Sequence, residues 1–213
     1  GKVNFIFQPA EEGGSGGKAM IEDGLFDIYP MDEIYALHNW PAMRAGTFGF
    51  RNGAIMASSN QFEINIEGKG GHAAMPHLCV DPVLISSHLI QSFQIISSRV
   101  IDPIEPVVIS VTKIEVGETA NIISGECKLL GTVRTFSIKV LDQVERRMAE
   151  ICDNSAKMFK AKINFNFTRQ YPPTINHEKQ TLIATNVATN MVGNENVISH
   201  VEPSMGAEDF AYM

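Results

Sequence analysis

The chain has 213 residues, of which 44% are hydrophobic and 19% charged, a composition that indicates a folded protein of one or two domains rather than a disordered chain. Its 17 Lys and Arg against 24 Asp and Glu give a formal net charge of -7, which offers no electrostatic basis for binding nucleic acid or an anionic membrane. No apolar run approaches the roughly 18 to 20 residues of a membrane span.

The first segment, residues 1–57, is predicted to be part of an α/β layer. Residues 3–7 form a short, almost continuous apolar run that is typical of a strand covered on both faces. A Gly-rich loop and a short helix over 18–23 follow, and residues 34–38 and 46–50 are two further strand candidates. Functional groups in such layers lie on the loops at strand ends, so those loops are where a site is expected.

A self-contained α+β unit is predicted between residues 58 and 167. Phe62, Ile64 and Ile66 alternate with polar residues, as in a half-buried strand, and Asp81-Pro82 and Ser137 are each suited to begin a helix. Strands are expected over 62–66, 107–114, 122–133 and 163–167, with buried helix faces made by Ile85, Leu89, Phe93, Ile96 and Val100 and by Val140, Val144, Met148 and Ile151. The order β-α-β-β-α-β is that of a ferredoxin-like fold.

After the segment Tyr171-Pro172-Pro173 the pattern changes again, with a helix expected over residues 179–191 and a short strand over 197–200. The α+β unit therefore interrupts a larger α/β domain. The predicted organisation is an α/β protein in which one domain occupies residues 1–57 and 168–213 and an inserted domain occupies residues 58–167.

The cysteines indicate a reducing compartment. Cys79, Cys127 and Cys152 are odd in number and far apart, which favours free, buried thiols in a cytoplasmic protein. No CxxC pair is present, so a structural zinc ribbon is excluded.

The most informative stretch is Gln8-Pro9-Ala10-Glu11-Glu12-Gly13-Gly14. Two adjacent carboxylates directly after a buried strand repel each other unless a cation or a proton relieves the repulsion. Adjacent side chains diverge, so one can bind a metal ion while the other acts as general base toward a water that the metal acidifies. A solvated acidic turn would also explain the dipeptide taken alone.

His38 lies at the end of the predicted strand 34–38, next to the acidic loop if the two strands are neighbours. A single histidine there is often structural, but beside two carboxylates it becomes a candidate metal ligand. The run Gly13-Gly14-Ser15-Gly16-Gly17-Lys18 is not a phosphate-binding loop, because that pattern needs Gly at position 12 and Ser or Thr at position 19, where Glu12 and Ala19 stand.

His72 lies in a second Gly-rich loop, Gly68-Lys69-Gly70-Gly71-His72-Ala73-Ala74, after the first strand of the inserted domain. Small neighbours leave the imidazole without packing partners, which suits a hydrogen-bond donor to a developing oxyanion. An incidental histidine in a flexible loop is the alternative.

Eight segments, spread in order from Gln8 to Met213, resemble the M20 family of metallopeptidases. The resemblance is to its amidohydrolase branch, which includes hippurate hydrolase, N-acyl-amino-acid amidohydrolases and auxin-conjugate hydrolases. The segments are QPAEEGGSGGKAMIEDGLFD, ALHNWP, GKGGHAAMPH, DPV, GETANIIS, GTVRTF, YPPTIN and SMGAEDFAYM.

The resemblance implies a di-metal catalytic domain with a phosphorylase/hydrolase-like fold, into which a ferredoxin-like lid and dimerisation domain is inserted. Glu11 matches the family's general base, and Glu12 and His38 match metal ligands. His72 matches the lid histidine that approaches the scissile carbonyl, often from the partner subunit of a dimer.

Four further residues lie in the matching segments, two as single residues and two as an adjacent pair. Asn121 matches a lid asparagine near the substrate. Arg134 matches an arginine that is a candidate for holding the substrate carboxylate, although a structural ion pair would suit it equally well. The pair Glu208-Asp209 is interpreted as carboxylates that support the ligands or cap a helix.

The chain also departs from the family. A Cys-Gly-His-Asp-type segment with two ligands, before QPAEE, and a last histidine ligand after SMGAEDFAY have no counterpart here. Ser124 stands where Pro is usual and Ala207 where Gly is common. Since Glu12 and His38 alone cannot complete a site for two metal ions, we expect the chain to be the middle of a longer protein, with N- and C-terminal segments of the catalytic domain outside it.

The sequence therefore predicts a hydrolase that cleaves the amide bond of small N-acyl amino acids with two divalent metal ions (Zn, Mn or Co), as a homodimer through the lid and without nucleic-acid or membrane partners. Two alternatives remain open. One is a dipeptide exopeptidase of the same family, and the other is a truncated, non-catalytic homologue that only dimerises or binds.

Overall fold

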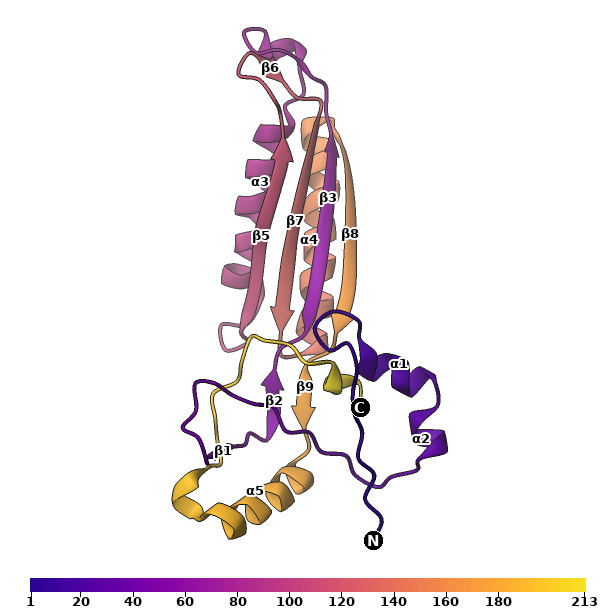
Figure 1. Cartoon of the computed structure of the whole chain (residues 1–213). Coiled ribbons are helices and arrows are strands. Elements are labelled where there is room, and N and C mark those ends of the chain that lie inside the picture. Colours follow the sequence, from indigo (N-terminus) through magenta and orange to yellow (C-terminus); the bar gives the residue numbers. More distant parts are fainter. The chain divides into compact units, whose positions relative to one another are not determined.

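A computed structural model describes all residues from 1 to 213 as a mixed α/β protein with two compact units (Figure 1). Unit 1 comprises residues 1–58 and 171–213, and unit 2 comprises residues 59–170.

Unit 2 is built on a four-stranded sheet whose order is β5-β7-β3-β8. The central strand β7 runs antiparallel to both of its neighbours, β5 and β3. The predicted succession strand, helix, strand, strand, helix, strand is present, with the ferredoxin-like strand order. The strands are β3 (Ser59–Glu67), β5 (Val107–Val116), β7 (Glu126–Thr135) and β8 (Lys162–Tyr171).

Two helices, α3 (Pro82–Ile95) and α4 (Ile138–Phe159), cover one face of this sheet (Figure 1). Both begin at the predicted caps: the Asp81 carboxylate accepts a hydrogen bond from the Val83 N–H, and the Ser137 hydroxyl accepts one from the Val140 N–H. The core between helices and sheet consists of apolar side chains, among them Phe62, Ile64, Ile66, Ile85, Leu89, Phe93, Ile96, Leu129, Val133, Val144 and Met148.

The buried face of α4 differs from the prediction at one position. Ile151 is only half-buried, whereas Cys152 is fully buried and burial raises the pKa of its thiol to about 12. Along α3 the predicted stripe is buried as far as Ile96, and Val100 is half-buried at the end of a π-helical turn, Ile96–Val100. None of the three cysteines forms a disulfide.

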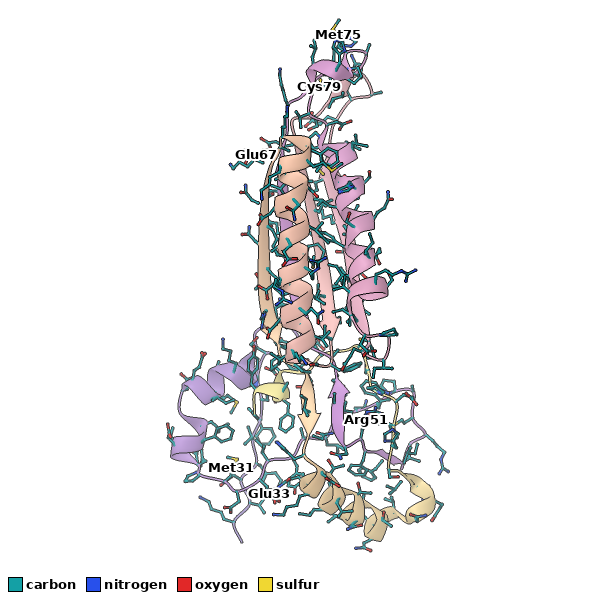
Figure 2. All side chains as sticks on the ribbon, turned by 180° about the vertical axis from the view of Figure 1, so that it is seen from behind. Met31, Glu33, Arg51, Glu67, Met75 and Cys79 are labelled. Carbon is teal, nitrogen blue, oxygen red and sulfur yellow. The ribbon has the colours of Figure 1, made fainter.

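The stretch 122–133, which was expected to form one strand, is divided between two strands. β6 (Ile122–Ile123) pairs with β4 (Gly71–His72), while β7 begins only at Glu126. Ser124 breaks the run, because its hydroxyl donates to the carbonyl of Glu126 and accepts from the Glu126 N–H. The break lets the chain leave the main sheet and build a small tip, where Figure 2 shows Met75 and Cys79 beyond Glu67.

Unit 1 consists of short elements. The two small ladders are β2 (Gly53–Met56) antiparallel to β9 (Thr174–Asn176), and β1 (Phe48–Gly49) parallel to β10 (Val197–Ile198). The helices are α1 (Gly16–Glu22), α2 (Leu25–Ile28) and α5 (Glu178–Val192), with 3₁₀ turns at Asn194–Asn196 (η3) and Asp209–Tyr212 (η4). The predicted helices over 18–23 and 179–191 are therefore present.

Two predicted strands of unit 1 are wrong. Residues 3–7 and 34–38 have no ladder partner and are irregular in conformation. Phe5 is 84% exposed and Leu37 82% exposed. An apolar run becomes a strand only when another strand accepts its backbone hydrogen bonds, and no segment of this chain does so here.

No helix of the structure has the length and apolar character to cross a membrane.

The burial difference along α4 predicts the effect of two matched substitutions. Met148 is fully buried and Met158, on the same helix, is 69% exposed. Met148→Ala should lower the free energy of unfolding of unit 2 by about 2–5 kcal/mol through the cavity that it leaves, and Met158→Ala by less than about 0.5 kcal/mol. Urea denaturation followed by circular dichroism measures both, and equal effects would contradict the packing described for α4.

Candidate functional site

The acidic stretch after Gln8 forms a tight turn that leads into α1. Ala10 and Ser15 both adopt left-handed backbone conformations, with φ of 52° and 50°, and the Gly14 N–H donates to the Ala10 carbonyl at 2.8 Å. Gly16 is required by close contact, because a Cβ atom there would lie 1.7 Å from the Pro9 carbonyl oxygen. The backbone conformation of Glu11 and Glu12 is therefore fixed by the residues on either side of them, from Pro9 to Gly16.

Glu11 faces two carboxylates that are distant in sequence. Ligand atoms of Glu11, Glu208 and Asp209 all lie within 4.8 Å of one another. Burial raises the pKa of the Glu11 carboxyl above its ordinary value, and Glu208, Glu12 and Asp209 raise it further by like-charge repulsion, while His38 opposes them. The cluster is a place where a cation would be stabilised and where a carboxylate readily takes up a proton.

Asp209 is fully buried and both of its carboxylate oxygens are occupied. Oδ2 accepts the Gly17 N–H at 2.7 Å, and Oδ1 accepts the side-chain amide of Gln8. Asp209 thus ties the two ends of the Glu11 turn to η4. This use of its oxygens makes it a support of the site rather than a free ligand.

Glu208 has one oxygen committed and one directed toward His38. Oε1 accepts the Phe210 N–H at 3.1 Å, which makes Glu208 the N-cap of η4. Oε2 lies 3.7 Å from Nε2 of His38. The sequence identified this pair as capping or supporting groups but did not predict that it would gather around Glu11, because the two segments are almost 200 residues apart.

His38 is oriented for its Nε2 atom to act. Its Nδ1 lies 2.7 Å from the Asn39 carbonyl oxygen, so a proton on Nδ1 is donated there and Nε2 keeps its lone pair. The ring of Trp40 packs edge-on against the imidazole, with 5.5 Å between ring centroids. A lone pair facing the Glu208 carboxylate favours a cation or a proton between the two atoms.

Glu12 does not join this cluster. Its side chain is exposed, and the carboxylates that meet are those of Glu11, Glu208 and Asp209. As donors for a divalent metal ion, the site offers carboxylate oxygens and one imidazole nitrogen, which are ligands that Zn, Mn and Co accept. The residues therefore fit a metal centre chemically, with fewer donors than two closed coordination shells need.

His72 and Asn121 are brought together at the tip of unit 2. His72 lies opposite Ile122 in the β4–β6 pair, and the Ala73 N–H donates to the Asn121 carbonyl at 3.0 Å. Nδ1 of His72 accepts the Ala74 N–H at 3.1 Å, which places the ring proton of the neutral imidazole on Nε2. The side chain is therefore set up as a hydrogen-bond donor.

Arg134 lies at the opposite end of the sheet in unit 2. Glu126, at the start of β7, pairs with Glu67 near the tip, and Arg134 is eight residues further along, or about 27 Å at the usual rise of a strand. The residue is half-buried, burial lowers the pKa of its guanidinium, and it forms no ion pair. The structural ion pair considered for Arg134 is thus not formed.

Comparison with known proteins shows what the chain as a whole is similar to. The model of peptidase family M20/M25/M40 matches residues 1–213. N-acetyl-L-cysteine deacetylase of Bacillus subtilis (strain 168) is 39% identical over 212 residues, which cover 100% of this chain and 50% of that protein. IAA-amino acid hydrolase ILR1-like 4 of Arabidopsis thaliana is 35% identical over 216 residues, covering 100% of this chain and 48% of that protein.

A solved structure agrees in fold with this chain. A dinuclear metal-binding peptidase of the M20 family from Bacillus subtilis superposes with a TM-score of 0.80 at 29% identity, over 98% of this chain and 51% of that one. The chain thus spans about half the length of the curated relatives that it matches.

The geometry of the acidic turn predicts a contrast between two glycines. Gly16→Ala should disrupt the turn, because the new methyl group meets the Pro9 carbonyl, and should destabilise unit 1 by at least about 1–3 kcal/mol. Gly13→Ala should stay within about 1 kcal/mol of the wild type, since nothing lies within 4 Å of a Cβ atom there. Thermal unfolding of the two variants compares them, and an equally tolerated Gly16→Ala would contradict the turn described.

Proposed function

The chain belongs to peptidase family M20/M25/M40, and from this premise we propose that it is part of a metal-dependent hydrolase that cleaves the amide bond of N-acyl amino acids. The observation that carries the proposal is the cluster at the acidic turn, where Glu11, Glu208 and Asp209 meet and His38 turns Nε2 toward Glu208. Relatives named as an N-acetylcysteine deacetylase and an IAA-amino acid hydrolase support this class of substrate.

In the proposed arrangement, unit 1 contributes to a catalytic domain and unit 2 is an inserted lid and dimerisation domain. Glu12 and His38 would hold metal ions together with ligands outside this chain. Two divalent ions, when bound, would polarise the scissile carbonyl and lower the pKa of the attacking water. The relative described as dinuclear supports two ions, and the chain does not identify the element.

The residues of this chain would divide the remaining work. Glu11 would accept the proton of the attacking water and deliver it to the leaving nitrogen. Its partial burial and, after that, the like charges around it raise its pKa, which suits a carboxylate that holds a proton between those events. His72 would donate its Nε2 proton in a hydrogen bond to the carbonyl oxygen as negative charge develops there. Asn121, beside it at the tip, would contact the same substrate.

Arg134 would bind the substrate carboxylate. A half-buried guanidinium without an ion pair is poorly solvated, and a bidentate carboxylate would satisfy it. Because His72 and Arg134 lie at opposite ends of the sheet in unit 2, one copy of that unit does not bring both to one small substrate. We therefore propose that the enzyme is a homodimer in which His72 acts on a substrate held by the partner copy.

The surface of unit 2 offers a place for this dimer contact. Strand β5 is an edge of the sheet, and helix α3, which packs against it, has no Asp, Glu, Lys or Arg. Val83, Leu84 and Ile95 are exposed on that helix. An open edge beside an uncharged helix face favours pairing of two lids across a two-fold axis. The free cysteines are compatible with the cytoplasmic location that we propose.

Substitution of the two adjacent carboxylates in the whole protein tests whether Glu11 is the general base and Glu12 a metal ligand. Glu11→Gln should keep both metal ions and lose turnover by about 10²-fold or more, since it removes the general base. Glu12→Gln should instead weaken metal affinity. Metal content per chain and hydrolysis of N-acetyl and aromatic N-acyl amino acids measure both. Identical behaviour of the two variants contradicts the assignment, and a wild-type protein that binds no metal favours the non-catalytic alternative.

Mixing two inactive variants tests the exchange of His72 between subunits. Glu11→Gln and His72→Ala proteins, mixed and allowed to exchange subunits, should regain about a quarter of wild-type turnover, because half of the dimers then contain one complete site. A mixture that stays inactive although mixed dimers are detected by mass spectrometry would show that His72 serves its own subunit, and a His72→Ala protein that is active by itself would show that His72 has no role.

A further inference from the structure

Tyr171 makes a contact with the proposed general base that the proposed function does not use. Tyr171 is the last residue of β8 and begins the second part of unit 1. Its hydroxyl donates a hydrogen bond of 2.8 Å to the main-chain carbonyl of Glu11, a residue 160 positions earlier. The donor is a half-buried side chain, so water competes with this hydrogen bond less than at an open surface.

The Glu11 peptide needs such a partner because its neighbours leave it unsupported. Ala10 is in a left-handed conformation, and the turn is closed at Ala10 by the Gly14 N–H, not at Glu11. The Glu11 side chain accepts no hydrogen bond, and Glu12 beside it is exposed. The tyrosine contact therefore restricts rotation of the peptide that follows Glu11, and with it the direction in which the carboxylate points.

Tyr171 is itself held in place. Its ring lies edge-on against Tyr212, with 6.3 Å between centroids and an interplanar angle of 83°. Tyr212 belongs to η4, the turn that also contains Asp209, and Asp209 accepts the Gly17 N–H beyond the far end of the acidic turn. The Glu11 carbonyl, through Tyr171, and the Gly17 N–H, directly, are thus both held by residues of the same short 3₁₀ turn, η4.

We propose that Tyr171 is a positioning residue for the general base, acting through the main-chain carbonyl of Glu11. It does not touch substrate or metal; it keeps the Glu11 carboxylate aimed at the place where the water proton is removed. The proposal rests on the proposed function, and catalysis is sensitive to it because small misplacements of a catalytic group lower turnover steeply.

The test is Tyr171→Phe in the whole protein, with Tyr35→Phe as matched control. Tyr35 is an exposed tyrosine of unit 1 whose hydroxyl also donates a hydrogen bond, to Glu33 at 2.7 Å. Tyr171→Phe keeps the ring against Tyr212 and removes only the donor. We expect kcat to fall about tenfold with KM changed less than about twofold, and metal content to stay at the wild-type value. Tyr35→Phe should match the wild type in all three.

A purely structural role would give a different result. Tyr171→Phe would then lower the melting temperature and the fraction of folded protein while kcat per folded molecule stayed at the wild-type value, and that outcome overturns the proposal. Loss of metal from Tyr171→Phe also overturns it, because the residue would then be supporting the ligands.

The same substitution in a Glu11→Gln background separates the remaining possibilities. If Tyr171 acts through the base, Tyr171→Phe should lower the residual turnover of Glu11→Gln by less than about twofold, since residues that act as a unit are not additive. A full tenfold loss in that background overturns the positioning role but leaves the proposed function standing. A wild-type protein without amidase activity, or an active Glu11→Gln, overturns the proposed function and this inference together.

Discussion

The structure of unit 1 depends on one buried carboxylate. Asp209 accepts the Gly17 N–H and the Gln8 amide, so that a segment close to one end of the chain fixes a turn close to the other. A buried carboxylate with both oxygens bonded is stable, whereas one that lost either donor would be left charged and unsatisfied. The position of Glu11 follows from this constraint, as does the approach of Glu208 to Glu11.

The site that results has an excess of negative charge and of lone pairs. Glu11, Glu208 and Asp209 crowd together, and Nε2 of His38 faces a carboxylate oxygen. Such an arrangement is unfavourable unless a cation or a proton lies within it, which is the physical reason that it suits metal-assisted hydrolysis. The tip of unit 2 favours a hydrogen-bond acceptor instead of a cation. There the Ala74 N–H donates to Nδ1 of His72, which leaves the ring proton on Nε2 free to be donated.

Unit 2 shows how far periodicity and capping carry a prediction. The alternation at Phe62, Ile64 and Ile66 and the caps at Asp81 and Ser137 are local signals, and the strand and helices that they predict are present. The break at Ser124 was not predicted because a two-residue hydroxyl turn leaves hydrophobicity almost unchanged. The strands expected over 3–7 and 34–38 failed for another reason: pairing is a property of two segments, and an apolar run contains no information about whether its partner is present.

The sequence by itself determined the family, through eight motifs in order, and with it the candidate residues Glu11, Glu12, His38 and His72 on which the proposed function rests. It also determined the succession of elements in unit 2, because helix caps and apolar periods are encoded within a few residues. Only the tertiary structure decided that Glu208 and Asp209 join Glu11, that Arg134 is left without an ion pair, and that Tyr171 bonds to the Glu11 backbone. Those contacts join residues up to about 200 positions apart, and spacing along a chain does not encode which distant groups folding brings together.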